Sequence, residues 1–507
     1  MLDSIKISVK DTVIYGFGNV AVKIVGLILI PLYTNPEYFN VDDFGVLGIL
    51  EISALVLTAI LASSLPQSLT RWYWDKEHLS NQKSIFFMSF STQVVISLTF
   101  CLLLLPVSGH VSTMLFDSPD WTNVIRLVII SSGLQAINNI INTLVRLQSK
   151  AILYSVTNIT KLVLVLTLTI ILIVNRGMGL EGIYLAQVVG NGAFLLILAG
   201  YTARNIKPSF NFRVFAEMNI YGLPLLIANI AAVILTVIDR YSLNSLALLK
   251  DVALYSMAFK ITSVLKLVIV DSTKLAITPV MFKKAGEAGS ERFYAKVLLY
   301  TSYILMSGII VISLFSFEVV KIITGSKEFW NSVVIIPVLS LSVFFVNLKE
   351  ITVFALHIVK KTRIIGITVI FLSILSLVLN ILLIPLWDIT GSAIATLLTQ
   401  IAYWLIILYY SEKHFHIPYE YRKLALVFIT GALISFSVLF INEYSLMIRM
   451  LTKLLLVVAF PFILYILKFY EKNELLAIRG FIKKWKNLRK LGDNLKSLKN
   501  ISDISGL

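Results

Sequence analysis

Long apolar runs, each bounded by charged or turn-forming residues, constrain this chain more than any other feature. A helix needs about 20 mostly apolar residues to cross roughly 30 Å of hydrocarbon, and runs of that length recur along the whole sequence. We therefore predict an all-α, polytopic membrane protein with about 14 transmembrane helices. The predicted spans are 12–34, 44–69, 84–106, 121–145, 152–174, 179–201, 216–240, 252–282, 295–317, 330–357, 364–385, 389–411, 423–441 and 448–470.

The composition agrees with this prediction, because few charged residues are available to cover a soluble surface. The 507 residues are 58% hydrophobic and 14% charged, whereas soluble domains carry roughly 25% charged residues. The net charge of +16 would suggest a nucleic-acid partner in a soluble protein. In a membrane protein the same excess reports orientation, so we expect no nucleic-acid partner.

The distribution of Lys and Arg predicts how the chain is oriented, because cytoplasmic segments are enriched in both. With the N-terminus placed in the cytoplasm, thirty basic residues fall in inside segments and six in outside segments. The imbalance predicts that both termini are cytoplasmic, which requires an even number of spans. The predicted external loops are short, so we expect no ectodomain between helices.

An internal repeat divides the predicted helices into two lobes. Three pairs of similar segments are separated by 206, 208 and 209 residues, and each pair lies at matching helix ends. The pairs are Ile14-Tyr15-Gly16 with Ile220-Tyr221-Gly222, Asp43-Phe44-Gly45 with Asp251-Val252-Ala253, and Gly182-Ile183 with Gly391-Ser392. Chance similarity between apolar segments is the alternative. Six helices separate the copies, so the repeat is parallel, as in transporters whose substrate lies between lobes.

The repeat predicts four parts of the chain. Residues 1–210 form an N-terminal lobe of six helices, and 211–415 form a C-terminal lobe of six more. Two extra helices occupy 416–470. A basic tail at 471–507 comes last, with apolar residues at helical spacing. We expect this tail to be an amphipathic helix on the anionic cytoplasmic leaflet, the alternative being a solvated basic tail.

Charged residues inside the predicted spans mark the candidate site, because a charge in hydrocarbon costs about 3 kcal/mol or more and is usually functional. Eight are basic and four acidic, and this excess favours an anionic substrate. The basic residues are Lys23, Arg126, Lys161, Arg240, Lys260, Lys266, Lys274 and Lys349, and the acidic ones are Glu51, Asp239, Asp271 and Glu350. Near helix ends such side chains can instead snorkel to the interface, as for Lys274 and Lys349. Lys349 can also pair with Glu350.

Two predicted helices carry stripes of small and polar residues along one face. In the first span the stripe includes Asn19 and Lys23, and in the seventh it includes Asn229 and Arg240. Close packing through small residues explains the glycines of these stripes but not the cations. We therefore place all four residues among the candidates for substrate binding.

Two further lysines are candidates for substrate binding. Lys260 stands eleven residues before Asp271 on one predicted helix, and at the depth of Glu51 in the other lobe. Ion pairing within the bundle is the alternative for Lys260. Lys161 has Asn158 three residues before it. We consider Glu51, Asp239 and Asp271 as candidates for coupling to a cation gradient.

A polar stripe on the fourth predicted helix allows two interpretations. Gln135, Asn138, Asn142 and Arg146 lie at spacings of three and four residues. Hydrogen bonds between packed helices and contacts to a sugar are equally good explanations of such a stripe.

Several catalytic and nucleotide-binding motifs are absent from the sequence. It contains no G-x-x-x-x-G-K-[ST], no H-E-x-x-H and no readable Ser/His/Asp arrangement. We therefore expect no enzyme activity, no catalytic residues, no cofactor and no metal site. A transporter of this kind would use an ion gradient or the gradient of its own substrate.

Several segments resemble Wzx-type polysaccharide flippases. They are Tyr15-Gly16-Phe17-Gly18-Asn19, Pro31-Leu32-Tyr33-Thr34, Asp43-Phe44-Gly45-Val46-Leu47, Arg71-Trp72-Tyr73, Asn380-Ile381-Leu382-Leu383-Ile384-Pro385 and Gly391-Ser392-Ala393-Ile394-Ala395-Thr396. The resemblance covers most of the chain and includes the two-lobe plan. It places the chain in the multidrug/oligosaccharidyl-lipid/polysaccharide exporter superfamily.

The resemblance implies a function and a set of partners. The expected activity is movement of a polyprenyl-diphosphate-linked oligosaccharide, the repeat unit of an O antigen or capsule, to the outer leaflet of a bacterial plasma membrane. Alternating access would be driven by a cation gradient, as in an antiporter. Cationic residues of the first, second and eighth helices bind the diphosphate in this family, which points to Lys23, Arg71 and Lys260. Membrane lipids and a polysaccharide polymerase or chain-length protein are the other expected partners.

Two alternatives remain open from the sequence. A cation-coupled multidrug exporter would have the same fold, but cationic drugs favour an acidic cavity rather than a basic one. A membrane glycan polymerase or acyltransferase belongs to another class. Such enzymes need a catalytic external loop or a buried His or Asp site, and the short loops disfavour them.

Overall fold

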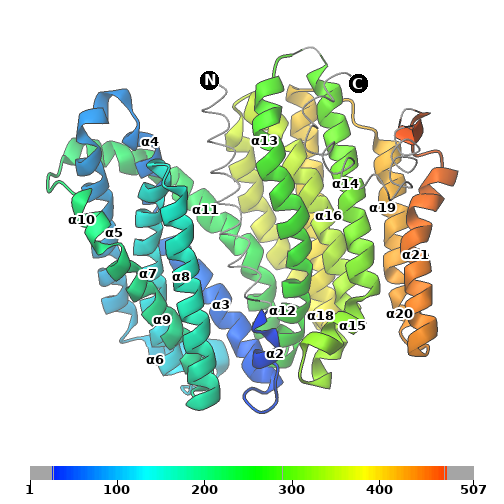
Figure 1. The fold of residues 1–507 in the computed structure, drawn as a ribbon, viewed down its shortest axis with the longest axis horizontal. Helices are drawn as coiled ribbons and strands as arrows, with labels where there is room; N and C mark the ends of the chain where they lie inside the picture. The colour runs from blue at the N-terminus through cyan, green and yellow to red at the C-terminus, as the bar shows by residue number, and fades with distance from the viewer. Residues whose placement is uncertain (1–25, 27, 288, 473, 477–507) are drawn as a thin grey trace, which may run out of the picture. The chain divides into compact units, whose positions relative to one another are not determined.

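A computed structural model describes residues 26, 28–287, 289–472 and 474–476. The described residues form helices joined by short turns, and no strand occurs among them (Figure 1). Contacts divide the chain into two compact units, Met1–Tyr419 and Glu420–Leu507.

Among the described residues, the helices of the predicted N-terminal lobe run from α2 to α10. They are α2 (Ile30–Tyr33), α3 (Val41–Leu61), α4 (Leu65–Tyr73), η1 (Lys76–Asn81), α5 (Gln82–Leu104), α6 (Ser108–Phe116), α7 (Thr122–Leu147), α8 (Ala151–Ile170), η2 (Ile171–Asn175), α9 (Gly179–Ile197) and α10 (Ala199–Arg204).

The helices of the predicted C-terminal lobe complete the first unit. They are α11 (Phe212–Leu246), α12 (Leu249–Leu265), η3 (Lys266–Asp271), α13 (Ser272–Lys284), α14 (Ser290–Leu314), α15 (Ser316–Ile323), η4 (Lys327–Ile335), α16 (Ile336–Thr352), α17 (Phe354–Ile358) and α18 (Thr362–His414). The second unit contains α19 (Tyr421–Phe436), α20 (Val438–Ile441) and α21 (Leu446–Ile466).

Twelve helical segments of the described chain are long and apolar enough to cross a membrane. This confirms the predicted polytopic all-α class. The first predicted span, 12–34, lies mostly outside the described residues. The predicted spans 364–385 and 389–411 both fall in α18, whose backbone is non-helical at Trp387 and Asp388. The total of about 14 and the cytoplasmic position of both termini stay predictions.

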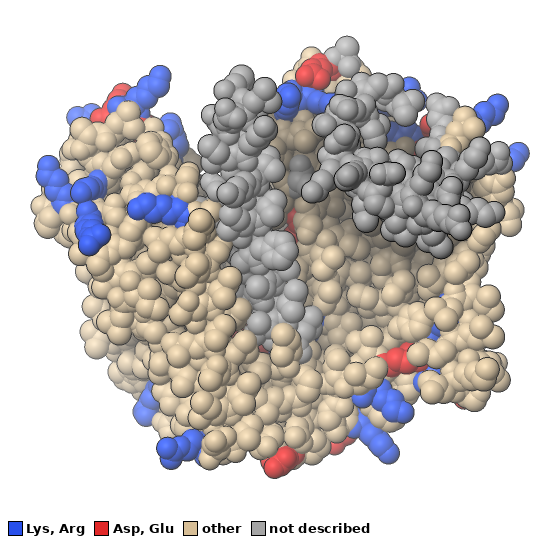
Figure 2. All heavy atoms as spheres, viewed as in Figure 1, with Lys and Arg blue, Asp and Glu red and all other residues tan. Residues whose placement is uncertain are grey.

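Charged side chains gather toward the two ends of the helices in the visible face of the molecule (Figure 2). Between them lies a broad band of uncharged residues. This distribution is the one expected for a protein whose middle faces hydrocarbon, because charged groups there are costly.

The beginning of α3 is defined by a reciprocal pair of hydrogen bonds. The backbone N–H of Asp43 donates to Asn40 Oδ1 at 2.7 Å, and the backbone N–H of Asn40 donates to Asp43 Oδ2 at 2.9 Å. This capping box satisfies two donors that a helix start leaves free. The Asp43-Phe44-Gly45 segment of the sequence repeat is therefore the first turn of α3.

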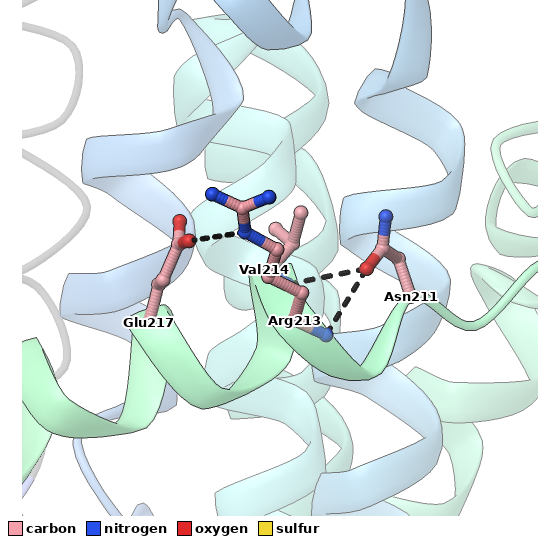
Figure 3. Close-up of polar contacts among 4 residues, drawn as sticks. All are labelled: Asn211, Arg213, Val214 and Glu217. Atoms are coloured by element: carbon pink, nitrogen blue, oxygen red, sulfur yellow. Dashed lines mark hydrogen bonds and ion pairs between the residues drawn. The ribbon is translucent and has the colours of Figure 1, made fainter.

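The beginning of α11 is capped in a related way. The side-chain oxygen of Asn211 accepts hydrogen bonds from the backbone N–H groups of Arg213 and Val214 (Figure 3). Arg213 Nε lies 3.4 Å from Glu217 Oε1, one turn further along the same helix. The whole helix is 35 residues long and contains Pro224.

This long helix packs against both groups of helices in the first unit. Near its beginning, the hydroxyl of Ser68 in α4 donates to the carbonyl of Met218 at 2.8 Å. Further along, the hydroxyl of Ser373 in α18 donates to the carbonyl of Ala231 at 3.1 Å. The first turns of α11 therefore pack with the N-terminal helices, although the sequence repeat assigns the whole helix to the C-terminal lobe.

The predicted amphipathic tail lies almost entirely outside the described residues, so its conformation stays a prediction. Residues 474–476 are the last that the structure describes.

Candidate functional site

The first halves of α3 and α12 lie in close contact, and two glycines make that contact possible. Gly45 faces the backbone carbonyl of Leu249, and a Cβ atom on Gly45 would overlap that carbonyl oxygen. One turn along, Gly48 lies against the side chain of Ser256. Both helices begin at this end, so the two lobes touch where α3 and α12 start.

An ion pair between the lobes lies just beyond these glycine contacts. Lys260 Nζ of α12 lies 2.6 Å from Glu51 Oε1 of α3. The same ammonium lies 5.5 Å from the ring centroid of Phe44. Partial burial strengthens such a pair relative to one in water. Lys260 and Glu51, which the sequence places at one depth in two lobes, are direct partners.

The pair lies near the middle of the predicted membrane thickness. Glu51 is ten residues into α3 and Lys260 eleven residues into α12, which is about 15 Å along each helix at 1.5 Å per residue. The hydrocarbon core is about 30 Å thick. Transporters with repeated lobes bind substrates and ions near this depth.

Arg240 of α11 is a second cation, and it packs against α12 one residue before Lys260. Its guanidinium carbon lies 4.4 Å from the ring centroid of Phe259, the residue before Lys260. One guanidinium nitrogen donates to the carbonyl of Thr236 at 3.0 Å. Arg240 is buried, and its Nε atom has no hydrogen-bond partner within the described residues. A buried donor without a partner is costly, and an oxyanion is the natural ligand for it.

Asp239 of α11 holds the neighbouring carboxylate. Its Oδ2 atom accepts hydrogen bonds from the hydroxyls of Tyr255 at 2.5 Å and of Thr396 at 3.1 Å. The two hydroxyls lie 3.0 Å apart. Asp239 and Tyr255 are fully or almost fully buried. A buried carboxylate surrounded by oxygen atoms from three helices can take up a proton or a small cation.

We call Glu51, Asp239, Arg240 and Lys260 the lobe-interface cluster. They come from α3, α11 and α12, and the hydroxyl pair Ser53–Tyr241, at 2.8 Å, ties α3 to α11 beside them. The cluster contains two cations and two carboxylates on three adjoining helices, and its Lys260–Glu51 pair lies at the contact between the predicted lobes. The cations can bind an anion, and the buried carboxylate of Asp239 can bind a proton or cation.

Two of the predicted substrate-binding residues lie away from this cluster. Arg71, at the end of α4, is exposed and forms an ion pair with Asp75 at 3.2 Å, one turn further on. Asn229 is an exposed residue of α11, ten residues before Asp239. Neither contacts the lobe-interface cluster.

Asp271 does not share the face of Lys260 that a regular helix would give it. The helix widens into a π-helical turn at η3 between the two residues. A π turn inserts an extra residue and rotates the rest of the helix relative to a regular α-helix. Asp271 is therefore separated from the cluster, where Glu51 is the partner of Lys260.

Lys161 lies inside the N-terminal helices instead of at the lobe interface. Its ammonium donates to Gln135 Oε1 of α7 at 2.7 Å, and it lies 5.8 Å from the ring centroid of Phe194 of α9. The interpretation of the α7 stripe as packing hydrogen bonds fits this geometry. Asn138 Nδ2 likewise donates to Asn191 Oδ1 at 3.1 Å, and Asn142 pairs with Asn158.

These amides stabilise the packing of α7 against α9, and a substitution tests that role. Asn191→Leu removes a donor to Ser131 and an acceptor from Asn138, both buried. We expect the free energy of unfolding to fall by about 1–3 kcal/mol for the unpaired groups. The apparent Tm in detergent should drop by several degrees. Asn219→Leu, which loses a bond only within its own helix, is the control and should leave the Tm nearly unchanged.

Two predicted residues, Asn19 and Lys23, lie outside the described residues. Their place relative to the cluster stays a prediction. No group of three His, Cys, Asp or Glu side chains suited to a metal ion occurs among residues that the structure does describe.

The structure adds residues that sequence reasoning missed. Tyr255, Phe259 and Thr396 contact the charged groups of the cluster directly. Thr396 is the last residue of the Gly391–Thr396 segment, which resembles the flippase family. That resemblance did not predict a role for Thr396. The other two lie on α12 within five residues of Lys260, and only the crossing of α11 makes them partners.

A family described as "Polysaccharide biosynthesis protein" matches residues 39–335, more than half of the chain. The chain belongs to this polysaccharide biosynthesis protein family. The match includes every member of the lobe-interface cluster. No curated protein sequence matches the chain.

Solved structures of a lipid II flippase and of MOP-superfamily transporters share the fold of this chain. A structure of the lipid II flippase MurJ in an inward closed conformation has a TM-score of 0.71 at 13% identity, covering 89% of this chain and 99% of that one. An inward-facing multidrug resistance MATE transporter of the MOP superfamily has a TM-score of 0.63 at 14% identity, covering 78% and 97%. An outward-facing structure of a MATE transporter of the same superfamily has a TM-score of 0.57 at 15% identity, covering 80% and 92%. At these identities the likeness shows the fold, a multi-pass bundle of helices shared with a flippase and with transporters.

Proposed function

We propose that this polysaccharide biosynthesis protein moves a polyprenyl-diphosphate-linked oligosaccharide from the cytoplasmic to the outer leaflet of a bacterial plasma membrane. The family match and the likeness to a lipid II flippase support a lipid-linked substrate. The repeat unit of a surface polysaccharide is the natural cargo of such a protein. A polymerase or chain-length protein that receives this cargo is the proposed partner.

The observation that carries the proposal is the pair of cations at the lobe interface. Lys260 and Arg240 lie on adjacent helices, Lys260 near the ring of Phe44 and Arg240 against the ring of Phe259. A diphosphate carries several negative charges and acceptor oxygens, which ammonium and guanidinium groups bind well. In the absence of substrate, Glu51 neutralises Lys260. An arriving diphosphate can replace Glu51 and so separate α3 from α12.

This replacement gives a physical reason for alternating access. Gly45, Gly48 and Glu51 hold α3 to α12 through the first half of both helices. Beyond them, Leu55 of α3 and Val268 and Leu275 of the α12–α13 segment are about half exposed. With the predicted orientation, the lobes are closed at the outer side and separated at the cytoplasmic side. Binding of the substrate would break this outer contact, open the outer side and let the lobes close at the cytoplasmic side.

Asp239 is the proposed coupling residue. Uptake of a proton or small cation by its buried carboxylate would change the charge next to Arg240 and rearrange the Tyr255 and Thr396 hydroxyls. Because α11 packs with both groups of helices, a change at Asp239 can reach both lobes.

Two other functions fit the data less well. A multidrug exporter of this fold is disfavoured, because Lys260 and Arg240 at the interface would repel cationic drugs. A glycan polymerase or acyltransferase is disfavoured, because the solved structures that share this fold include a flippase and a multidrug transporter.

Site-directed variants in proteoliposomes test the assignment of the diphosphate site. We expect Lys260→Ala to slow movement of a polyprenyl-diphosphate oligosaccharide about tenfold, the value of one charge-assisted hydrogen bond. Lys23→Ala combined with Lys260→Ala should slow it further. Lys250→Ala is the control, since Lys250 is at the start of the same helix and pairs with the exposed Glu328. Unchanged movement in the Lys23/Lys260 double variant would contradict the site.

A further inference from the structure

A second charged group lies between α13 and α16, beyond the π-helical turn that follows α12. Glu350 of α16 is held between two lysines, Lys349 on its Oε1 atom and Lys274 of α13 on its Oε2 atom at 2.6 Å. Lys349 also lies 4.8 Å from the ring centroid of Tyr403. Both lysines thus pair with Glu350, which was the alternative given for Lys349.

The charges of this group do not balance. Lys349 and Lys274 are two ammonium groups on the single carboxylate of Glu350. Lys266, which is exposed at the start of η3, adds a third lysine on the same helix as Lys274. An excess of positive charge at membrane depth is costly unless an anion or water compensates it.

The two partners of Glu350 differ in their exposure, and this difference determines which one can exchange. The Lys349 side chain is 13% exposed and that of Lys274 is 56% exposed. A buried carboxylate needs one cation to be neutralised, and Lys349 supplies it. Lys274 can leave Glu350 without stranding a buried charge, and its ammonium then offers three donors to another anion.

The space beside the ion pair shows from which side that anion must come. A cavity of about 30 Å³ lies between α13 and α16, lined by Thr273, Lys274, Asn347 and Glu350 among others. It is large enough for one or two waters but too small for a phosphate. A ligand must therefore meet Lys274 from its exposed side, where Lys266 is also exposed.

Three lysines within the predicted span 252–282 form a series along this helix. Lys274 lies fourteen residues beyond Lys260, with Lys266 between them, so the series extends over about 20 Å at 1.5 Å per residue. With the predicted orientation, Lys274 is the member nearest the cytoplasm. Among these three lysines, an anion entering from that side meets Lys274 first and Lys260 last.

We infer that Lys274 and Lys266 form an entry site for the diphosphate of the lipid-linked substrate, with Glu350 as the exchangeable counter-ion that occupies Lys274 when the site is empty. This inference rests on the proposed function and adds a binding step before the lobe-interface cluster. The diphosphate displaces Glu350 from Lys274, while Lys349 keeps the carboxylate neutralised. The substrate then moves along the helix to Lys266 and Lys260.

Binding measured on the full-length protein in phosphatidylcholine nanodiscs tests the entry site. The probes are a polyprenyl diphosphate and phosphatidylglycerol, whose headgroup phosphate is the other source of this chemistry. We expect Lys274→Gln to weaken diphosphate binding about tenfold. Lys250→Gln, a lysine of similar exposure in an ion pair at the start of α12, should leave it unchanged. Glu350→Gln should strengthen binding several-fold, because the competing carboxylate is gone.

Weaker binding by Lys274→Gln should not reflect misfolding, because this variant keeps the Lys349–Glu350 pair. Lys274→Arg should restore most of the binding. Equal affinities for Lys274→Gln and Lys250→Gln would overturn the entry site. So would a Lys274→Gln variant that loses phosphatidylglycerol and keeps the diphosphate. If the wild type binds the diphosphate through Lys274 but moves no lipid, the entry site stands and the proposed function fails. If Lys274→Gln binds and moves lipid like the wild type, the function stands and the entry site fails.

Discussion

Gly45→Ala is expected to reduce transport at least tenfold while the protein remains folded. The added Cβ atom would overlap the carbonyl oxygen of Leu249, a backbone atom that cannot rotate away. Overpacking of this kind costs about 1–3 kcal/mol, and it acts only in the conformation where α3 and α12 touch. A cost of about 2 kcal/mol changes the ratio of the two conformations about thirtyfold. The variant should therefore spend little time with its lobes closed at this end.

Chemical labelling measures this shift directly. The chain has one cysteine, Cys101, so Cys101→Ser gives a background for a single probe. Val252 is fully buried at the α3 contact, and a thiol in Val252→Cys should react slowly with a membrane-impermeant reagent. Adding Gly45→Ala should speed the reaction. Gly192→Ala is the matched control, because nothing lies within 4 Å of a Cβ on Gly192. Equal labelling in the two glycine variants would show that the contact is not where the lobes part.

Asp239→Asn is expected to abolish the dependence of transport on a cation gradient. The amide oxygen can still accept hydrogen bonds from Tyr255 and Thr396, so the local geometry is kept. The carboxylate that would bind a proton or cation is lost. We expect the rate of lipid movement with an imposed proton or sodium gradient to equal the rate without one.

Tyr255→Phe is the control for this variant. It removes the hydroxyl bound to Asp239 at 2.5 Å but keeps the carboxylate, so it should lower the rate and retain the response to the gradient. If transport by Asp239→Asn still responds to the gradient, another carboxylate must couple transport to it. Glu51 would then be the next candidate, because it is released when substrate binds Lys260.

The sequence predicted the helices well, because spanning hydrocarbon leaves few alternatives. Each predicted span within the described residues falls on a candidate membrane helix. The number of membrane helices differs from the number of predicted spans at one place in the described chain, α18. Pro385, Trp387 and Asp388 interrupt α18 without a loop, so two predicted spans form one continuous element.

The site was predictable in its residue types but only partly in its geometry. The cost of intramembrane charge selected Lys260, Arg240, Glu51 and Asp239, and the repeat placed Lys260 and Glu51 at one depth. Their contact at 2.6 Å depends on how closely the lobes approach. That approach depends on Gly45, whose importance a single sequence does not reveal.

Other features depended on contacts that no spacing rule describes. The π-helical turn at η3 changes the face of Asp271, and the sequence around it has no proline or glycine to signal it. Lys161 meets Gln135 because α7 and α8 happen to pack there. Lys274 looked like a snorkelling residue, since its partner Glu350 is 76 residues away in the sequence.

The most direct test of the account is transbilayer movement by the purified wild-type protein. Proteoliposomes would carry a fluorescent polyprenyl-diphosphate oligosaccharide, and a membrane-impermeant reagent would quench the label in the outer leaflet. We predict that the protein raises the quenched fraction well above the half reached in protein-free vesicles. A cationic drug loaded in the same vesicles should not be moved. Quenching that stays at half, or release of sugar or phosphate from the lipid instead of its movement, would contradict the account.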